Sequence, residues 1–209
     1  MRTSLHSLLF VLLPGITVAQ DNGPLWLRGS SISPDGQHIA FCYQGDIWRV
    51  PVTGGDAVAL TTNEAYDYAP VWSHDGKQIA FASVRYGNAD VFVMPSTGGA
   101  PTRLTYHGNG EMPADFSADN ANVIFYGTRQ DDVKNQQFPV GGLGEMYSVP
   151  AKGGRPVQVS TIAMQMARYN PAGTVIAYHD RKGYEDSWRK HHTSSVTRDI
   201  WSFNPATKE

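Results

Sequence analysis

The chain has 209 residues, of which 41% are hydrophobic and 17% charged, and these proportions indicate a folded protein rather than a disordered one. The net charge is -2 and no basic run occurs, so a nucleic-acid-binding surface is not expected. The single cysteine, Cys42, excludes an internal disulfide and a cysteine-built zinc site, and no cofactor or metal is expected. The 21 glycines and 13 prolines favour many short strands joined by turns.

Residues 1–19 have the composition of a secretory signal peptide. Arg2 and His6 lie in a short polar start, Leu8 to Val18 form an apolar stretch of 11 residues, and small residues around Ala19 offer a cleavage site. This stretch is about half of the ~20 apolar residues that span a bilayer. The sequence therefore predicts a periplasmic or extracellular protein without a membrane span. The alternative is a buried N-terminal helix.

A four-part pattern follows the N-terminal segment and occurs four times. Each copy has a Ser-Pro-Asp-Gly type turn, an Ile-Ala-Phe type run, an Asp-Ile-Trp type run and, in the first three copies, a Gly-Gly turn followed by a Leu-Thr type run. The first turns begin 40, 44 and 53 positions apart, at Ser33, Ser73, Ser117 and Asn170. The Asp-Ile-Trp type runs begin at Asp46, Asp90, Glu145 and Asp199.

Each copy predicts four short antiparallel strands. The Pro-Asp-Gly turn suits a tight hairpin, and aromatic and β-branched residues dominate the second and third runs. These runs are apolar on both alternating faces, so both faces should be buried. A four-stranded unit of ~40–45 residues covered on both faces is a β-propeller blade. The sequence thus predicts an all-β propeller with blades at about 26–61, 62–105, 106–160 and 161–209.

These repeats resemble those of TolB-like propellers, and more closely the N-terminal propeller of bacterial tricorn-protease homologues. The resemblance covers Trp26 to Glu209, and the stretch from Arg181 to Trp201 looks like an insertion that tricorn-type peptidases carry in an early blade. It implies a large serine peptidase of the C-terminal-processing type, with a second propeller, a PDZ-like domain and a catalytic domain downstream.

The fourth copy stops in the turn at 204–209, so its blade should lack the outer strand and the chain should be a fragment. The alternative is a complete four-bladed ring in which the segment around 26–32 completes the last blade.

No catalytic site is expected in this chain. The Gly-x-Ser-x-Gly elbow is absent, and neighbouring residues of an extended segment point to opposite faces, so His191 and His192 should not act together on Ser194, Ser195 or a metal. The chain alone is therefore predicted to be inactive. By the resemblance, the catalytic residues of the parent peptidase lie beyond Glu209.

The candidate binding residues are basic and aromatic. Arg85, Arg129 and Arg181 recur after the second run of three copies, at hairpin tips on one rim, where they either pair with nearby carboxylates or attract the carboxylates of peptide substrates. A second set in the fourth copy is expected to dock against downstream domains of the same chain: Trp188, Arg189, Lys190, His191 and His192. The carboxylates that open the third strands are expected to accept backbone N–H groups of the preceding hairpins.

Three functions follow from these observations. The first is a non-catalytic propeller segment of a secreted tricorn-like serine peptidase that serves peptide access, gating and domain docking. The second is a TolB-like periplasmic protein-binding module without peptidase activity. The third, an enzyme with its site in the propeller mouth, is disfavoured because inward-facing acids or histidines do not cluster. The expected partners are peptides or proteins, downstream domains and, because an open arc exposes blade faces, further copies of the chain.

Overall fold

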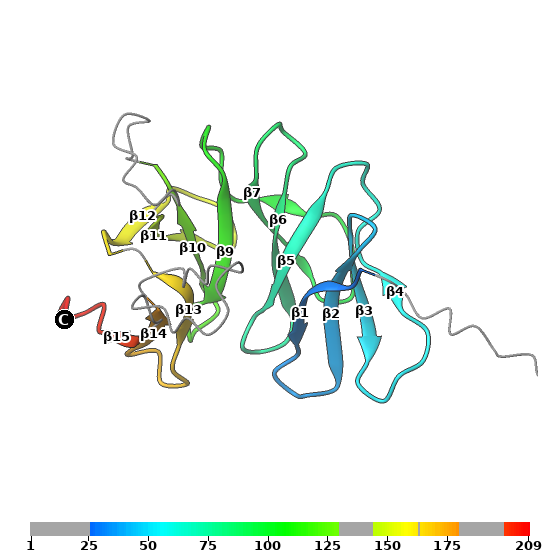
Figure 1. Ribbon diagram of the computed structural model, residues 1–209, viewed down its shortest axis with the longest axis horizontal. Coiled ribbons are helices and arrows are strands. Elements are labelled where there is room, and N and C mark those ends of the chain that lie inside the picture. The colour runs from blue at the N-terminus through cyan, green and yellow to red at the C-terminus, as the bar shows by residue number, and fades with distance from the viewer. Residues whose placement is uncertain (1–25, 130–143, 163, 180–198) are drawn as a thin grey trace, which may run out of the picture.

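The computed structural model describes residues 26–129, 144–162, 164–179 and 199–209, and every regular element in these ranges is a β-strand. The strands form four antiparallel sheets in which strands consecutive in sequence are neighbours. The sheets are blades that follow one another along an arc, from the first (blue) to the fourth (orange and red) in Figure 1. The predicted all-β propeller class is confirmed.

Each sheet corresponds to one copy of the sequence pattern. The first contains β1 (Arg28–Ile32), β2 (His38–Tyr43), β3 (Asp46–Pro51) and β4 (Val58–Ala59). The second contains β5 (Asp67–Trp72), β6 (Gln78–Ser83), β7 (Asp90–Pro95) and β8 (Thr102–Arg103). The third contains β9 (Glu111–Phe116), β10 (Asn122–Gly127), β11 (Glu145–Pro150) and β12 (Val157–Ser160). The fourth has three described strands, which are β13 (Gln165–Tyr169), β14 (Ile176–His179) and β15 (Ile200–Phe203).

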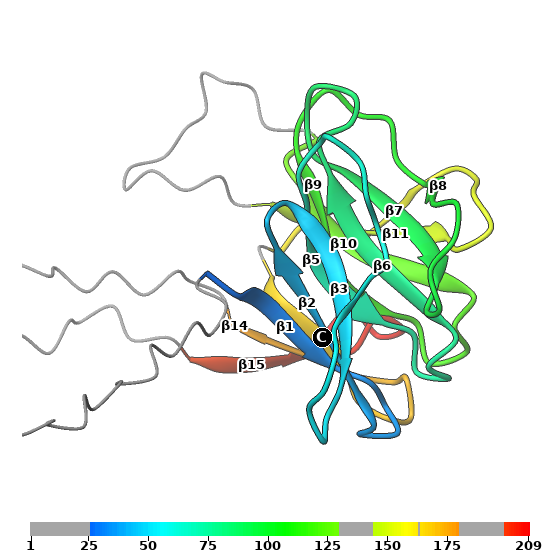
Figure 2. The same ribbon diagram turned by 90° about the vertical axis from the view of Figure 1, so that its right-hand side faces the viewer.

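The hydrophobic core consists of three layers, each between two consecutive sheets. Small and aliphatic side chains of one sheet pack against aromatic side chains of the next. For example, Val91 of β7 in the second sheet and Phe125 of β10 in the third belong to one buried cluster. The inner strands also pack in series, β1 on β5, β5 on β9 and β9 on β13. Figures 1 and 2 both show the second and third sheets side by side. The middle sheets are therefore covered on both faces, as the double-sided apolar runs predicted.

Polar groups add links between sheets. The indole Nε1 of Trp72 donates to the backbone oxygen of Ser31 at 3.0 Å, which joins the second sheet to the first. The Asp115 carboxylate on β9 accepts the backbone N–H of Tyr169 on β13 at 2.7 Å, which joins the third sheet to the fourth. Burial raises the pKa of Asp115.

Turns of the Ser-Pro-Asp-Gly type are held by the same bonds in the first three blades. In the second, Ser73 Oγ donates to Asp75 Oδ1 at 2.6 Å and accepts the N–H of Gln78, while Asp75 accepts the N–H of Lys77. The fourth turn residue has a positive φ, which glycine supplies at Gly76 (φ 70°). The hydrogen bond from serine lowers the pKa of the turn aspartate in each copy, at Asp35, Asp75 and Asp119.

Removing one turn carboxylate should cost about 1 kcal/mol, because Asp75→Ala loses two hydrogen bonds at a largely exposed site. A carboxylate with a lowered pKa stabilises the fold above its unfolded pKa of about 3.9, and this stabilisation disappears as the pH falls through the lower folded value. Urea unfolding should therefore show the deficit at pH 7 and a smaller one at pH 3. Asp56→Ala, in the exposed β3–β4 turn, is the control. An equal deficit at both pH values would contradict this account.

Candidate functional site

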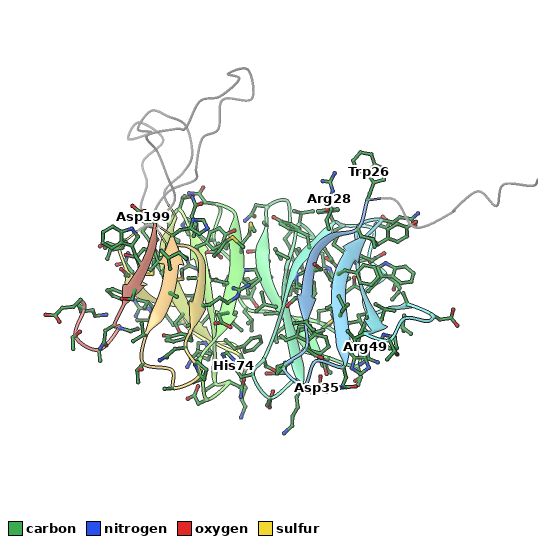
Figure 3. All side chains as sticks on the ribbon, turned by 60° about the horizontal axis from the view of Figure 1, so that its bottom comes forward. Trp26, Arg28, Asp35, Arg49, His74 and Asp199 are labelled. Atoms are coloured by element: carbon green, nitrogen blue, oxygen red, sulfur yellow. The ribbon has the colours of Figure 1, made fainter. Side chains whose placement is uncertain are left out.

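Arg85 and Arg129, the two predicted binding residues that the structure describes, lie at one rim of the arc. We call it the hairpin rim, because the second strand of each sheet ends there and the third strand begins there. Figure 3 shows Trp26, Arg28 and Asp199 at this rim and Asp35, Arg49 and His74 at the opposite one. The first strand of each sheet also begins at the hairpin rim, so side chains from β5 and β9 meet those that follow β6 and β10.

Arg85 lies between the first two sheets with its guanidinium on a buried carboxylate. Its Nη2 is 2.7 Å from Asp67 Oδ2, and the exposed fractions of the two side chains are 16% and 0%. The guanidinium carbon lies 5.8 Å from the ring centre of Phe81 and 5.3 Å from that of Phe92. Arg85 is therefore an interior side chain for most of its length, whereas the sequence predicted an exposed hairpin tip.

Arg129 repeats this arrangement between the second and third sheets. Its Nε pairs with Glu111 Oε1, and the exposed fractions are 20% and 0%. The guanidinium carbon lies 5.2 Å from the ring centre of Phe125 and 5.0 Å from that of Tyr147. Burial, followed by the hydrogen bond that its hydroxyl donates to Glu145, raises the pKa of Tyr147 to about 12.

We call these two pairs, Asp67–Arg85 and Glu111–Arg129, the arginine caps. Each closes the aromatic layer between two sheets at the hairpin rim, and its carboxylate comes from the first residue of the inner strand. Sequence reasoning identified the arginines but missed the acids. A signal existed, since Asp67 and Glu111 each stand six positions before the first serine of their turn.

A third ion pair lies at the same rim and was also missed. Arg103 Nη2 of β8 is 2.7 Å from Asp90 Oδ2, whose side chain is 0% exposed. The guanidinium carbon lies 4.2 Å from the ring centre of Tyr86 and 4.4 Å from that of Tyr106. Burial raises the pKa of Asp90, and the nearby Arg103 partly offsets this shift.

The acids that open the third strands have different partners. Asp46 Oδ1 accepts the hydroxyl of Thr61, Asp90 faces Arg103, and Asp199 is exposed. Glu145 Oε2 accepts the backbone N–H of Arg129 at 3.3 Å. The expected bond to a hairpin N–H is therefore present at Glu145, while side-chain partners replace it at Asp46 and Asp90.

A cavity of about 430 Å³ opens at the hairpin rim of the first sheet. Arg28 and Tyr66 line it, and Cys42 lies beside it, with a buried Sγ that donates to the Asp67 backbone oxygen. The Arg28 side chain is exposed and lies over the Trp26 ring, and no carboxylate of the described residues is within 4.0 Å of it. Arg28 is thus an accessible cation that the sequence analysis did not single out.

Several predicted residues fall outside the described ranges: Arg181, Trp188, Arg189, Lys190, His191, His192, Ser194 and Ser195. Within the described ranges, no three His, Cys, Asp or Glu side chains are grouped so that they could hold a metal ion. The same ranges contain no helix long and apolar enough to cross a membrane.

Residues 24–209 match the family model of the tricorn protease N-terminal β-propeller domain. The chain therefore belongs to this family. This tricorn-type propeller is 35% identical to tricorn protease homolog 1 of Streptomyces coelicolor over 92 residues. The match covers 44% of this chain and 8% of that protein. An uncharacterised protein of Agrobacterium fabrum is 32% identical over 117 residues, or 53% of this chain and 39% of that protein. The matches thus span well under half the length of these relatives.

Solved structures show the same fold at low sequence identity. A putative TolB from Agrobacterium tumefaciens superposes with a TM-score of 0.67 at 18% identity, covering 88% of this chain and 60% of that one. The tricorn protease superposes with a TM-score of 0.64 at 11% identity, covering 88% of this chain and 22% of that one.

Proposed function

We propose that this tricorn-type propeller is a non-catalytic N-terminal segment of a secreted serine peptidase, where it admits peptides and docks against the other domains. The observation that carries the proposal is the family match over residues 24–209, which is supported by the identity with tricorn protease homolog 1. Secretion through residues 1–19 belongs to the same proposal. N-terminal sequencing of the exported protein should begin at Gln20, and an intact Met1 would contradict export through this segment.

We place peptide binding at the hairpin rim. The exposed Arg28 guanidinium beside a 430 Å³ cavity can pair with a terminal carboxylate, and the Trp26 and Tyr66 rings offer apolar contact to the adjoining side chain. Arg85 and Arg129 remain candidates for the same role, although each guanidinium is already paired with a buried acid. Arg181 would extend this basic fringe to the fourth blade. Residues 188–192 are proposed to contact a downstream domain.

Binding of fluorescent peptides, measured by anisotropy, tests this placement. Peptides with a free C-terminal carboxylate should bind more tightly than their amides. Arg28→Ala should weaken binding of the free carboxylate about 3- to 10-fold, since a charge-assisted contact is lost. Arg155→Ala, an exposed arginine in the β11–β12 turn on the opposite rim, should have no effect. Equal binding of acid and amide would contradict carboxylate recognition.

The alternative is a TolB-like binding module that acts without a peptidase. The fold of the putative TolB supports it to the same degree as that of the tricorn protease, because both superpose over 88% of this chain. A folded partner protein bound at the hairpin rim, together with no affinity for short peptides, would favour this alternative.

A further inference from the structure

The loop that leads from the second sheet to the third carries an exposed asparagine followed by a glycine. Asn109 and Gly110 stand directly before Glu111, whose carboxylate belongs to the second arginine cap. Among the described residues, no hydrogen bond holds the Gly110 N–H. Because glycine has no Cβ, its backbone nitrogen is also unhindered. A free backbone nitrogen therefore lies next to the Asn109 side-chain amide.

We propose that Asn109 is a modification site, which converts to aspartate and isoaspartate by spontaneous deamidation. The Gly110 nitrogen attacks Cγ of the Asn109 side chain, the new N–Cγ bond replaces the bond to Nδ2, and Nδ2 leaves as ammonia with the proton of the Gly110 N–H. Water then opens the cyclic imide at either carbonyl. One amide and one water thus become one carboxylate and one ammonia, and the chain gains a negative charge. This inference is independent of the peptidase proposal.

The Asn109 side chain holds the loop against the third sheet, so the reaction has a structural consequence. Its Nδ2 donates to the backbone oxygen of Thr128, the residue before Arg129. The Asn109 backbone oxygen accepts the side-chain amide of Asn88 at 3.1 Å, which ties the loop to the β6–β7 hairpin. A carboxylate at position 109 has no N–H to donate and repels the Thr128 oxygen. Isoaspartate also adds a methylene to the main chain two residues before Glu111, so both products loosen the loop that positions this acid.

Storage of the folded protein at mildly alkaline pH, followed by peptide mapping with tandem mass spectrometry, tests the modification. Aspartate and isoaspartate should accumulate at position 109. Asn63 is an exposed asparagine followed by Glu64, so it reports exposure without a following glycine and should convert at least several-fold more slowly. No conversion at position 109, or conversion of Asn63 at the same rate, would overturn the proposal.

Two glycine variants identify the attacking nitrogen. Gly110→Ala should slow the conversion at least several-fold, because the added methyl group hinders approach to the nitrogen. The fold accepts this methyl, since a Cβ at position 110 would lie 3.7 Å from Ala89 Cβ, an ordinary van der Waals distance. Gly108→Ala, where a Cβ would meet no atom within 4 Å beyond its chain neighbours, is the matched control and should leave the rate unchanged. Equal rates in the two variants would contradict attack by Gly110.

Asn109→Asp reproduces the aspartate product and tests its effect on the fold. This variant should unfold at a lower urea concentration than the unmodified protein, because the bond to the Thr128 oxygen is lost. Asn63→Asp is the control and should leave the midpoint unchanged, since Asn63 Oδ1 accepts the N–H of Ala65 and a carboxylate can accept it equally. An unchanged midpoint in Asn109→Asp would overturn the structural consequence of the modification.

Discussion

Arg129→Met will lower the free energy of unfolding by about 3–5 kcal/mol, because it leaves the Glu111 carboxylate without its cation in the interior. The Glu111 side chain is 0% exposed, and its Oε1 forms an ion pair with the Arg129 guanidinium. Methionine has a similar length and keeps contact with the rings of Phe125 and Tyr147, so the loss reports mainly the charge. Denaturation by guanidinium chloride at pH 7 measures it.

The double variant Glu111→Gln with Arg129→Met should recover most of this loss, since no buried charge then remains unpaired. Arg155→Met changes an exposed arginine of the same blade and should stay within about 0.5 kcal/mol of the unmodified protein. A loss below about 1 kcal/mol in Arg129→Met would mean that the arginine caps are not structural. The two guanidiniums would then be free for the ligand role predicted from the sequence.

Phe125→Ala should also cost about 3–5 kcal/mol. Its side chain is 0% exposed in the layer between the second and third sheets, its ring stacks on Tyr147 at 5.6 Å, and it lies under the Arg129 guanidinium. The substitution therefore removes core packing and one wall of an arginine cap together. Thermal and chemical unfolding both measure the effect.

Val157→Ala, at a 64% exposed position on β12 of the same blade, is the control and should change stability by less than about 0.5 kcal/mol. If Phe125→Ala and Val157→Ala were equally stable, the layers between sheets would not be the source of stability in this fold.

The blade organisation could be predicted from the sequence because its determinants are local. The turn of the Ser-Pro-Asp-Gly type at Ser73-His74-Asp75-Gly76 closes through bonds among residues 73–78, and the same bonds recur in the first and third blades. The double-sided apolar runs required cover on both faces, and a repeated four-stranded blade provides that cover. Both signals depend on residues a few positions apart, so a sequence repeat carries them.

The arginine caps were predicted only in part because their carboxylates come from another strand. Asp67 and Glu111 occupy the same repeat position, but Leu27 and Met164 stand there in the first and fourth copies. Two acids in four copies do not form a repeat signal. The exposure of an arginine beside a hairpin is decided by whether such an acid lies under it, which is a tertiary property.

The sequence analysis expected exposed blade faces in an open arc, and Ile200 of the fourth sheet is 86% exposed. Ile200 has the same local sequence as Ile47 and Val91, namely an apolar residue after an acid that opens a strand. Its exposure depends on which sheet packs over it, and that neighbour is not encoded in the strand itself.

Native mass spectrometry of the chain with a mixture of free-acid and amidated peptides tests the central claim most directly, since it reports binding and cleavage together. The account predicts complexes with the free-acid peptides in which the peptide mass is unchanged after prolonged incubation, with or without divalent metal. Shortened peptides, with cleavage abolished by Ser195→Ala or His192→Ala, would contradict the non-catalytic role. The absence of any peptide complex would contradict peptide access at the hairpin rim.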